Sequence, residues 1–216
     1  NTKHNITKES VSGEIELIDA SLLKLSPWFD FPEKTYFDAK IENKINYQFL
    51  FADFEISAVI EGEINEGSGN FQKTLFEGIS ADWQCYLQKR NLDCKDSNLN
   101  IKTISAGAQL HQFKVKSDFQ WHDKQWLLAL KRIQGELFNG NFLVKNVDVS
   151  PNADIKGQLT LSHFSLSEIV KLQQQQGIAV NGYIDGTLPF QYKEGEFVIQ
   201  NGKLINHQNG LIQIDG

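Results

Sequence analysis

The residues of this 216-residue chain with the potential for chemistry are five histidines, two cysteines and 27 Asp and Glu side chains. No HxxxH or HExxH spacing occurs among His4, His111, His122, His163 and His207. Trp121-His122-Asp123 is better explained as a polar turn beside a buried tryptophan than as a pair of metal ligands. GxSxG, Walker and GxGxxG motifs are missing, which leaves acyl transfer and nucleotide binding without motif support. Sequence spacing leaves a glycosidase carboxylate pair open. We therefore assign no catalytic residue, no metal ligand and no cofactor.

Cys85 and Cys94 are the only cysteines, and eight residues separate them. This spacing fits neither a zinc site, which uses two to four intervening residues and two more ligands, nor a CxxC redox pair. Two interpretations remain: two unrelated buried thiols, or a disulfide that closes a hairpin tip around the polar segment Tyr86–Asp93. A disulfide would indicate an oxidising compartment. It would also stabilise the fold by about 3 kcal/mol in the chain-entropy model.

Aromatic residues are abundant, with 15 Phe, 5 Tyr and 4 Trp. A β-sheet core explains most of them singly, because strands favour aromatic side chains for packing. Together they allow a second interpretation, in which an open, curved sheet leaves one apolar face unpaired. A helix, a partner chain or a lipid must then cover that face, because large exposed apolar patches are rare in monomers.

The elements that position these side chains are mostly strands, because apolar and polar residues alternate with a period of two along most of the chain. The pattern predicts a mainly β protein of about a dozen strands, in which each strand has one apolar and one solvated face. In the first half, one alternation phase predicts the lining of an apolar groove. That lining is Phe37, Ala39, Ile41, Tyr47, Phe49, Phe54, Ile56, Ala58 and Ile60.

Turn signals recur every 8–12 residues, as in a meander of hairpins. The strongest is Asn139-Gly140, because Asn-Gly accepts the positive φ angles of a type I′ turn. Glu66-Gly67-Ser68-Gly69-Asn70 indicates a flexible turn, and Lys193-Glu194-Gly195 predicts another reversal. These signals favour a curved antiparallel sheet built of hairpins.

One helix is specified near residues 166–176. Ser165 is its expected N-cap, Glu168 at the third helical position completes a capping box, and Gly177 is expected to end it. A second, short helix is predicted near residues 20–25, before Pro27.

Composition sets the class of the protein. Hydrophobic residues make up 40% and charged residues 22%, as in an ordered domain. The net charge is -6 and no basic stripe is visible, so nucleic acid is not an expected partner. No apolar run is long enough to span a bilayer, and no signal peptide opens the chain. Met is absent and an apolar run meets the C-terminus, so we expect a fragment of a longer protein.

The C-terminal third resembles a known family in a series of short segments. These are Gly135–Gly140, Leu159–Ile169, Gly177–Ile178, Asn181–Phe190 and Phe197–Leu204. The first looks like the G-x-L-x-G-G-type hairpin of AsmA-like proteins. The others form a strand, a helix with a Leu/Gln-rich end, a G-x-x-x-G-x-L-P strand and an I-x-x-G-x-L hairpin. The order is similar to the C-terminal region of the YdbH family, which some classifications label "dicarboxylate transport".

This resemblance implies one elongated β-groove domain over residues 1–216, in the periplasm of a diderm bacterium. The parent protein would be anchored in the inner membrane and would conduct phospholipid between the two membranes along an apolar groove. Further partners would be an outer-membrane-associated lipoprotein or other envelope proteins. The resemblance implies no catalytic residue. Together with the oxidising compartment that it implies, the spacing of Cys85 and Cys94 predicts that these two residues form a disulfide. The dicarboxylate label has little support, because Arg90 and Arg132 are the only arginines for binding small anions.

Three functions follow from the sequence. The first is a non-enzymatic, lipid-conducting groove segment. The second is a closed β-sandwich or barrel that binds a small ligand or glycan. The third is a structural spacer. An open sheet with a continuous apolar face favours the first, and a compact closed barrel with a polar pocket lined by tryptophan favours the second.

Overall fold

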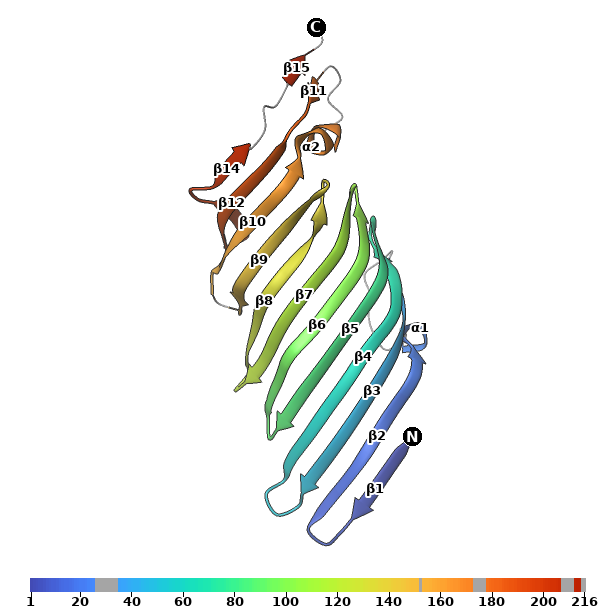
Figure 1. Cartoon of the computed structure of the whole chain (residues 1–216). Helices are drawn as coiled ribbons and strands as arrows, with labels where there is room; N and C mark the ends of the chain where they lie inside the picture. Colours follow the sequence, from blue (N-terminus) through green and yellow to red (C-terminus); the bar gives the residue numbers. More distant parts are fainter. Residues whose placement is uncertain (26–34, 152, 173–177, 207–211, 215–216) are drawn as a thin grey trace.

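A computed structural model describes residues 1–25, 35–151, 153–172, 178–206 and 212–214. One antiparallel sheet of 13 strands dominates it (Figure 1). Its strands are β1 (Thr2–Ile6), β2 (Ser10–Ser21), β3 (Thr35–Leu50), β4 (Glu55–Phe71), β5 (Thr74–Gln88), β6 (Asn91–Ala106), β7 (Ala108–His122), β8 (Gln125–Leu137), β9 (Gly140–Val149), β10 (Ile155–Ser165), β12 (Tyr183–Lys193), β13 (Glu196–Ile199) and β14 (Lys203–Asn206). They lie in chain order from β1 to β10, and β12 follows and pairs with both β13 and β14. A second sheet pairs β11 (Ile178–Val180) with β15 (Ile212–Ile214).

The sheet is open, because β1 lies at one end of the strand order and β13 and β14 lie at the other. Strands β3 to β7 are 15–17 residues long, well beyond the usual strand length. The predictions of a mainly β chain and of a curved antiparallel sheet built of hairpins are therefore confirmed.

The hairpin predicted at Asn139-Gly140 is confirmed, but its turn lies one residue earlier. The central residues are Phe138 and Asn139, with φ angles of 52° and 57°, and Gly140 already begins β9. A Cβ atom at Gly140 would lie 2.6 Å from the carbonyl oxygen of His163. Gly140 is therefore needed for a close approach of two backbones rather than for the turn itself.

The flexible turn predicted at Glu66–Asn70 is wrong, because these residues lie inside β4. Glu66 has a φ of 54° and forms a bulge, after which the strand continues to Phe71. Gly67 and Gly69 leave room for neighbouring side chains: a Cβ at Gly69 would lie 2.4 Å from the Phe37 ring. The turn occurs instead at residues 72–73.

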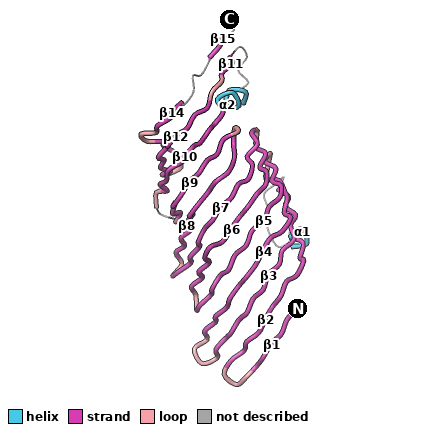
Figure 2. Tube along the Cα trace, viewed as in Figure 1, coloured by secondary structure: helices cyan, strands magenta, loops and turns pink. Residues whose placement is uncertain are grey.

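Bulges bend many of the strands. Inside strands, six residues other than glycine adopt a left-handed conformation: Asp19, Glu66, Asp96, Gln112, Asn146 and His163. The pairing register shifts next to five of them, all except Asn146. Each bulge bends its strand and increases the local twist. Their repetition from β2 to β10 accounts for the curved shape of the sheet in Figure 2.

Two helices lie among the described residues. The helix predicted near 20–25 is α1 (Leu22–Leu25), and residues 20 and 21 end β2 instead. The helix predicted near 166–176 is α2 (Leu166–Leu172), and its predicted end at 173–177 lies outside the described residues. Ser165 Oγ accepts the expected capping bond from the Glu168 N–H at 3.4 Å. The Ser165 N–H donates to the Phe138 carbonyl instead, so only half of the capping box forms.

Candidate functional site

One side of the sheet carries a continuous row of aliphatic side chains, called here the aliphatic row. Residues paired directly across antiparallel strands share a face, so the ladder register identifies the members. They are Ala20, Ile41, Ile64, Ala81, Leu99, Val115, Ile133, Val144, Leu159 and Leu188. At about 4.8 Å per strand, this row runs roughly 43 Å across ten adjacent strands. We call this side of the sheet the apolar face.

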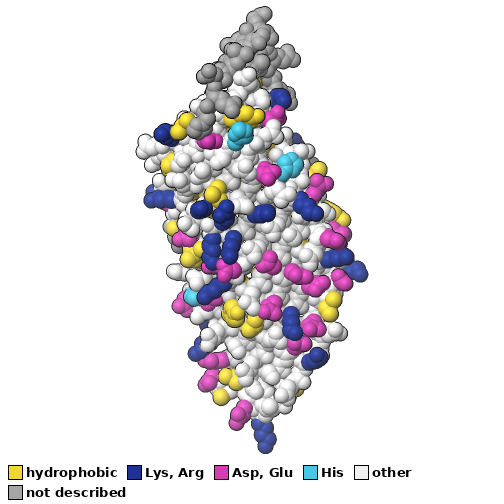
Figure 3. Space-filling model, in the orientation of Figure 1, with side chains coloured by type: hydrophobic (Ala, Val, Ile, Leu, Met, Phe, Trp, Pro, Cys, Tyr) yellow, Lys and Arg dark blue, Asp and Glu magenta, His cyan; other side chains and the backbone are white. Residues whose placement is uncertain are grey.

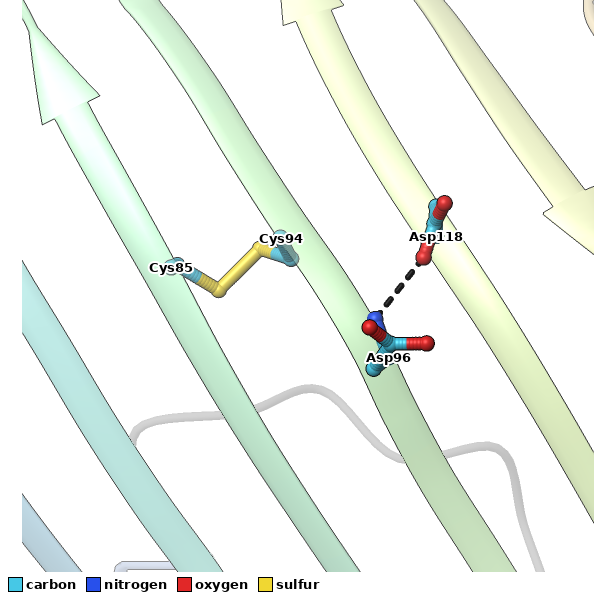
Figure 4. Close-up of a disulfide and its surroundings, with 4 residues drawn as sticks. All are labelled: Cys85, Cys94, Asp96 and Asp118. Carbon is cyan, nitrogen blue, oxygen red and sulfur yellow. Dashed lines mark hydrogen bonds between the residues drawn. A yellow bond between two sulfur atoms is a disulfide. The ribbon is translucent and has the colours of Figure 1, made fainter.

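A second row on the apolar face contains the disulfide. In register order it consists of Ile15, Ile45, Ile60, Cys85, Cys94, Phe119, Leu128 and Val149. Cys85 on β5 and Cys94 on β6 are directly paired, with 4.0 Å between their Cα atoms (Figure 4). The disulfide is therefore confirmed, and the hairpin that it closes turns at residues 89–90.

Eight of the nine residues predicted to line a groove lie in β3 or β4, and their register places them on the apolar face. Ala39, for example, is 7% exposed and lies beside Gly67 of β4. Phe54 is the exception, and its placement in a strand is wrong. It lies in the turn between β3 and β4, with a φ of 52° and 82% of its surface exposed. The left-handed backbone ends the alternation there, although the Phe54 ring remains 6.4 Å from the ring of Phe49.

Glycines paired with aromatic rings are a feature of the apolar face that the sequence reading missed. Gly62 of β4 pairs with Trp83 of β5, and a Cβ at Gly62 would lie 2.3 Å from the Trp83 ring. Gly157 lies in the same way beneath Phe190 of β12. An aromatic ring therefore occupies the space that a side chain would fill at each glycine. The feature that marks these sites is a glycine paired directly with an aromatic residue on the next strand. It can be recognised only when the register of the strands is known.

The apolar face has no second layer over it among the described residues. No described side chain there or elsewhere is less than 2% exposed, and Ile56 on the apolar face is 39% exposed. The chain exposes 14919 Å², whereas a compact monomer of 24.6 kDa would expose about 10,000 Å². A large apolar surface is therefore available for contact with another molecule.

The opposite side of the sheet, called here the polar face, is held by charged cross-strand contacts. Lys131 of β8 lies 3.1 Å from Asp96 of β6 and 2.8 Å from Asp118 of β7. Lys116 lies 2.9 Å from Asp96, whose N–H donates to Asp118 at 2.7 Å (Figure 4). Hydrogen bonds from Lys116 and Lys131 lower the pKa of Asp96, and those to Asp118 and Asp96 raise the pKa of Lys131. Partial burial raises the pKa of Asp118, but the bonds from Lys131 and the Asp96 N–H outweigh it, so this pKa is also lowered.

Two histidines of the described strands each contact a single polar side chain. His122 contacts Asp93 of the neighbouring strand at 3.0 Å rather than Asp123, and Trp121 beside it is 45% exposed, not buried as expected. His4 Nδ1 lies 2.6 Å from the Tyr47 hydroxyl. Among the described residues, no group of three or more His, Cys, Asp or Glu side chains could hold a metal ion. No described helix is both long and apolar enough to cross a bilayer.

Comparisons with known proteins identify the family. Residues 56–216, which run from β4 to the C-terminal end, match the family model described as "YdbH-like: Intermembrane phospholipid transport protein YdbH". No curated protein and no solved structure matches the chain. The strands before residue 56 continue the same sheet, because β3 pairs with β4 along nearly its whole length. The match covers most of the chain, which therefore belongs to the YdbH-like family of intermembrane phospholipid transport proteins.

Proposed function

We propose that the chain is a non-enzymatic segment of an envelope-spanning lipid-transport protein. Its apolar face shields the acyl chains of phospholipid as the lipid passes between the inner and outer membranes. The observation that carries this proposal is the aliphatic row across ten strands, over which no second layer of described residues lies. Family membership supports the same function. The disulfide supports a periplasmic location, because such bonds persist in oxidising compartments.

The uniformity of the aliphatic row suits movement of a lipid along it. Each buried CH₂ group contributes about 0.8 kcal/mol, so partial burial of an acyl chain suffices for binding. Because every strand presents a similar branched or small aliphatic side chain, neighbouring positions bind a chain with similar free energy. A lipid can therefore shift from strand to strand without a deep minimum. The closed sandwich or barrel is less well supported, because the strand order has two separate ends.

The wider context belongs to the same proposal. The parent protein is anchored in the inner membrane, and the groove continues beyond residues 1–216. Phospholipid is the cargo, and an outer-membrane-associated lipoprotein or another envelope protein receives it. Native mass spectrometry of protein purified from bacterial cells is expected to detect co-purified phospholipid.

Photo-cross-linking tests which face the lipid contacts. Probes placed at Phe49, Ile56 and Ile60 on the apolar face are expected to label phospholipid. Probes at Gln48, Glu55 and Glu61 are matched controls, because each is the chain neighbour of a test position and lies on the opposite face. Equal labelling of both sets, or no labelling of either, contradicts the proposal.

Substitution of adjacent residues sharpens the test. Ile56→Asp is expected to abolish lipid cross-linking from a probe at Ile60, because it puts a charge on the path of the acyl chain. Ser57→Asp introduces the same charge one residue away, on the polar face, and is expected to leave labelling unchanged. If Ser57→Asp reduces labelling as much as Ile56→Asp does, general destabilisation rather than blockage explains the loss.

A further inference from the structure

The polar face carries a row of charges whose signs are separated along the sheet. Direct ladder pairs join one residue from each of seven neighbouring strands, β3 to β9. In order, this charged row consists of Glu42, Glu63, Asp82, Asn98, Lys116, Arg132 and Lys145. Three acids therefore come first, Asn98 lies at the centre, and three bases follow. Figure 3, which looks onto the polar face, shows Lys and Arg side chains gathered over β7–β9.

This separation of signs is unfavourable within a single chain. Like charges placed directly opposite each other on neighbouring strands destabilise a sheet. The neighbouring row on the same face avoids this, since Lys44 lies between Glu16 and Glu61. Lys44 also forms ion pairs with Glu14 at 2.8 Å and Glu16 at 3.6 Å. The charged row therefore differs from this neighbouring row.

The charges of the row are also largely uncompensated. All six charged residues are exposed. Lys116 is paired with Asp96, and Asp82 accepts a hydrogen bond from Asn98. Glu63 accepts a hydrogen bond from Asn65, and Arg132 Nε donates one to Gln134, so both contacts are with neutral side chains. Within the described part of the chain, Glu42, Arg132 and Lys145 form no ion pair, and neither does Glu63 or Asp82. These groups are available to opposite charges on another molecule.

The order of the signs determines which molecule fits. A uniformly cationic partner would be repelled by the basic half of the row, and a uniformly anionic partner by the acidic half. The partner must carry both signs in the reverse order, and a second copy of this chain does so when it is turned about a two-fold axis. The acids lie one, two and three strands from Asn98 on one side, and the bases lie at the same separations on the other side. The axis therefore runs parallel to the strands and passes through Asn98.

We propose that the polar face is a self-association surface on which two copies of this chain dock around Asn98. Asp82 then faces the partner's Lys116, Glu63 faces the partner's Arg132, and Glu42 faces the partner's Lys145. The symmetry repeats each contact, as in any isologous interface, which gives six ion pairs. The acidic half borders a hollow of about 630 Å³, which Lys44 and Lys95 also line.

The geometry ranks the contacts. Neighbouring strands of a sheet are rotated by roughly 20–25°, so two facing rows diverge away from the axis. The pairs between Asp82 and the partner's Lys116 contribute most, and those at Glu42 and Lys145 contribute least. Docking through the polar face leaves both apolar faces uncovered, so the proposal stands independently of the proposed function.

Sedimentation of the full chain tests the proposal. A dimer is expected at about 0.1 M salt and a monomer at about 1 M, because the screening length falls from about 10 Å to about 3 Å. Asp82→Lys and Lys116→Asp are each expected to weaken dimerisation by at least about tenfold, because each puts like charges across the axis. An equimolar mixture of the two variants is expected to restore the dimer, since every central contact then joins opposite charges.

Glu77→Lys is the matched control. It reverses an exposed charge on the same strand and face, but outside the charged row, and is expected to dimerise like the unmodified chain. A monomer at both salt concentrations overturns the proposal. So does association that strengthens with salt and is insensitive to Asp82→Lys, which would indicate contact through the apolar face. Failure of the mixed variants to associate also overturns it.

Discussion

The two faces of β4 and β5 are organised by different interactions. On the apolar face, Trp83 lies over Gly62, and Cys85 extends a covalent link to β6. On the polar face of the same strands, Gln84 donates a hydrogen bond to Glu61, and Lys89 near the hairpin turn lies 2.7 Å from Glu55. Side-chain packing and a disulfide therefore join the strands on the apolar face, whereas hydrogen bonds and ion pairs between side chains join them on the polar face.

This difference explains how the sheet remains stable without a sealed core. The described buried apolar residues are few, and most are small: Ala39, Ala58, Cys85, Cys94, Ile101, Val147 and Phe164. Stability rests on long ladders of backbone hydrogen bonds and on cross-strand side-chain pairs, each of which contributes a fraction of a kcal/mol. These interactions join the strands within the plane of the sheet and do not depend on a second layer over the apolar face.

Loss of the disulfide is expected to have the largest effect on stability. Replacing Cys85 and Cys94 together by valine puts apolar, β-branched side chains at both positions and removes the link. The free energy of unfolding is expected to fall by about 3 kcal/mol, because the unfolded chain regains loop entropy. Urea denaturation measures this change. Reducing agent should lower the midpoint of the unmodified chain and leave the variant unchanged, and titration of two free thiols in unfolded, unreduced protein would contradict the prediction.

Filling the space beneath Trp83 is expected to have the next largest effect. Gly62→Val puts methyl groups where the Trp83 ring lies, so the free energy of unfolding should fall by about 1–3 kcal/mol. Glu61→Val, on the polar face next to it, should change stability less. Adding Trp83→Ala to Gly62→Val should cost less than the sum of the two single changes. Additive effects in this double-mutant cycle would show that the ring does not lie over Gly62.

The sequence was sufficient to predict the elements of the sheet and the phase of most strands. Ile41, Tyr47 and Ile60 were placed on the apolar face because alternation alone determines which face a residue occupies within an uninterrupted strand. The spacing of Cys85 and Cys94 alone left free thiols open, and the disulfide was predicted by combining that spacing with the oxidising compartment that the family resemblance implies. The charged row could not be recognised at all, because its order exists only once seven strands are in register.

Interruptions of the strands were the main cause of error. Glu66 and Gln112 adopt left-handed conformations inside strands, although neither residue type favours them. The local sequence gives no sign of such a bulge, because the surrounding register imposes it. The glycines after Glu66 were therefore interpreted as a turn. Phe54 illustrates the reverse error, in which a turn residue was assigned to a strand. It is apolar and in phase with the alternation of β4, but it lies in the turn that precedes β4.

Relief of backbone strain at a bulge is expected to give a smaller, stabilising effect. Gln112 is exposed and has a φ of 50°. Gln112→Gly removes the Cβ that disfavours this conformation. The strain relieved is larger than the conformational entropy that glycine loses on folding, so the free energy of unfolding should rise by about 0.5–1 kcal/mol. Thermal or urea denaturation should show a higher midpoint. Gln112→Ala keeps the Cβ and should show no such gain, and a gain equal to that of glycine would rule out strain as the cause.

The ion pairs around Asp118 on the polar face are expected to make the smallest contribution, and one that depends on pH. The lowered pKa of Asp118 means that the folded state favours its charged form. Its stabilising effect is therefore fully present above the unfolded pKa of about 3.9 and is lost as the pH falls through the lower, folded pKa. Asp118→Asn keeps an oxygen for the Asp96 N–H and removes the charge. Urea midpoints of the two proteins should differ at neutral pH and converge as the pH falls below the lowered, folded pKa of Asp118. A difference that stays constant with pH would show that shape rather than charge is responsible, and Asp123→Asn in the β7–β8 turn serves as the control for a nearby loss of charge.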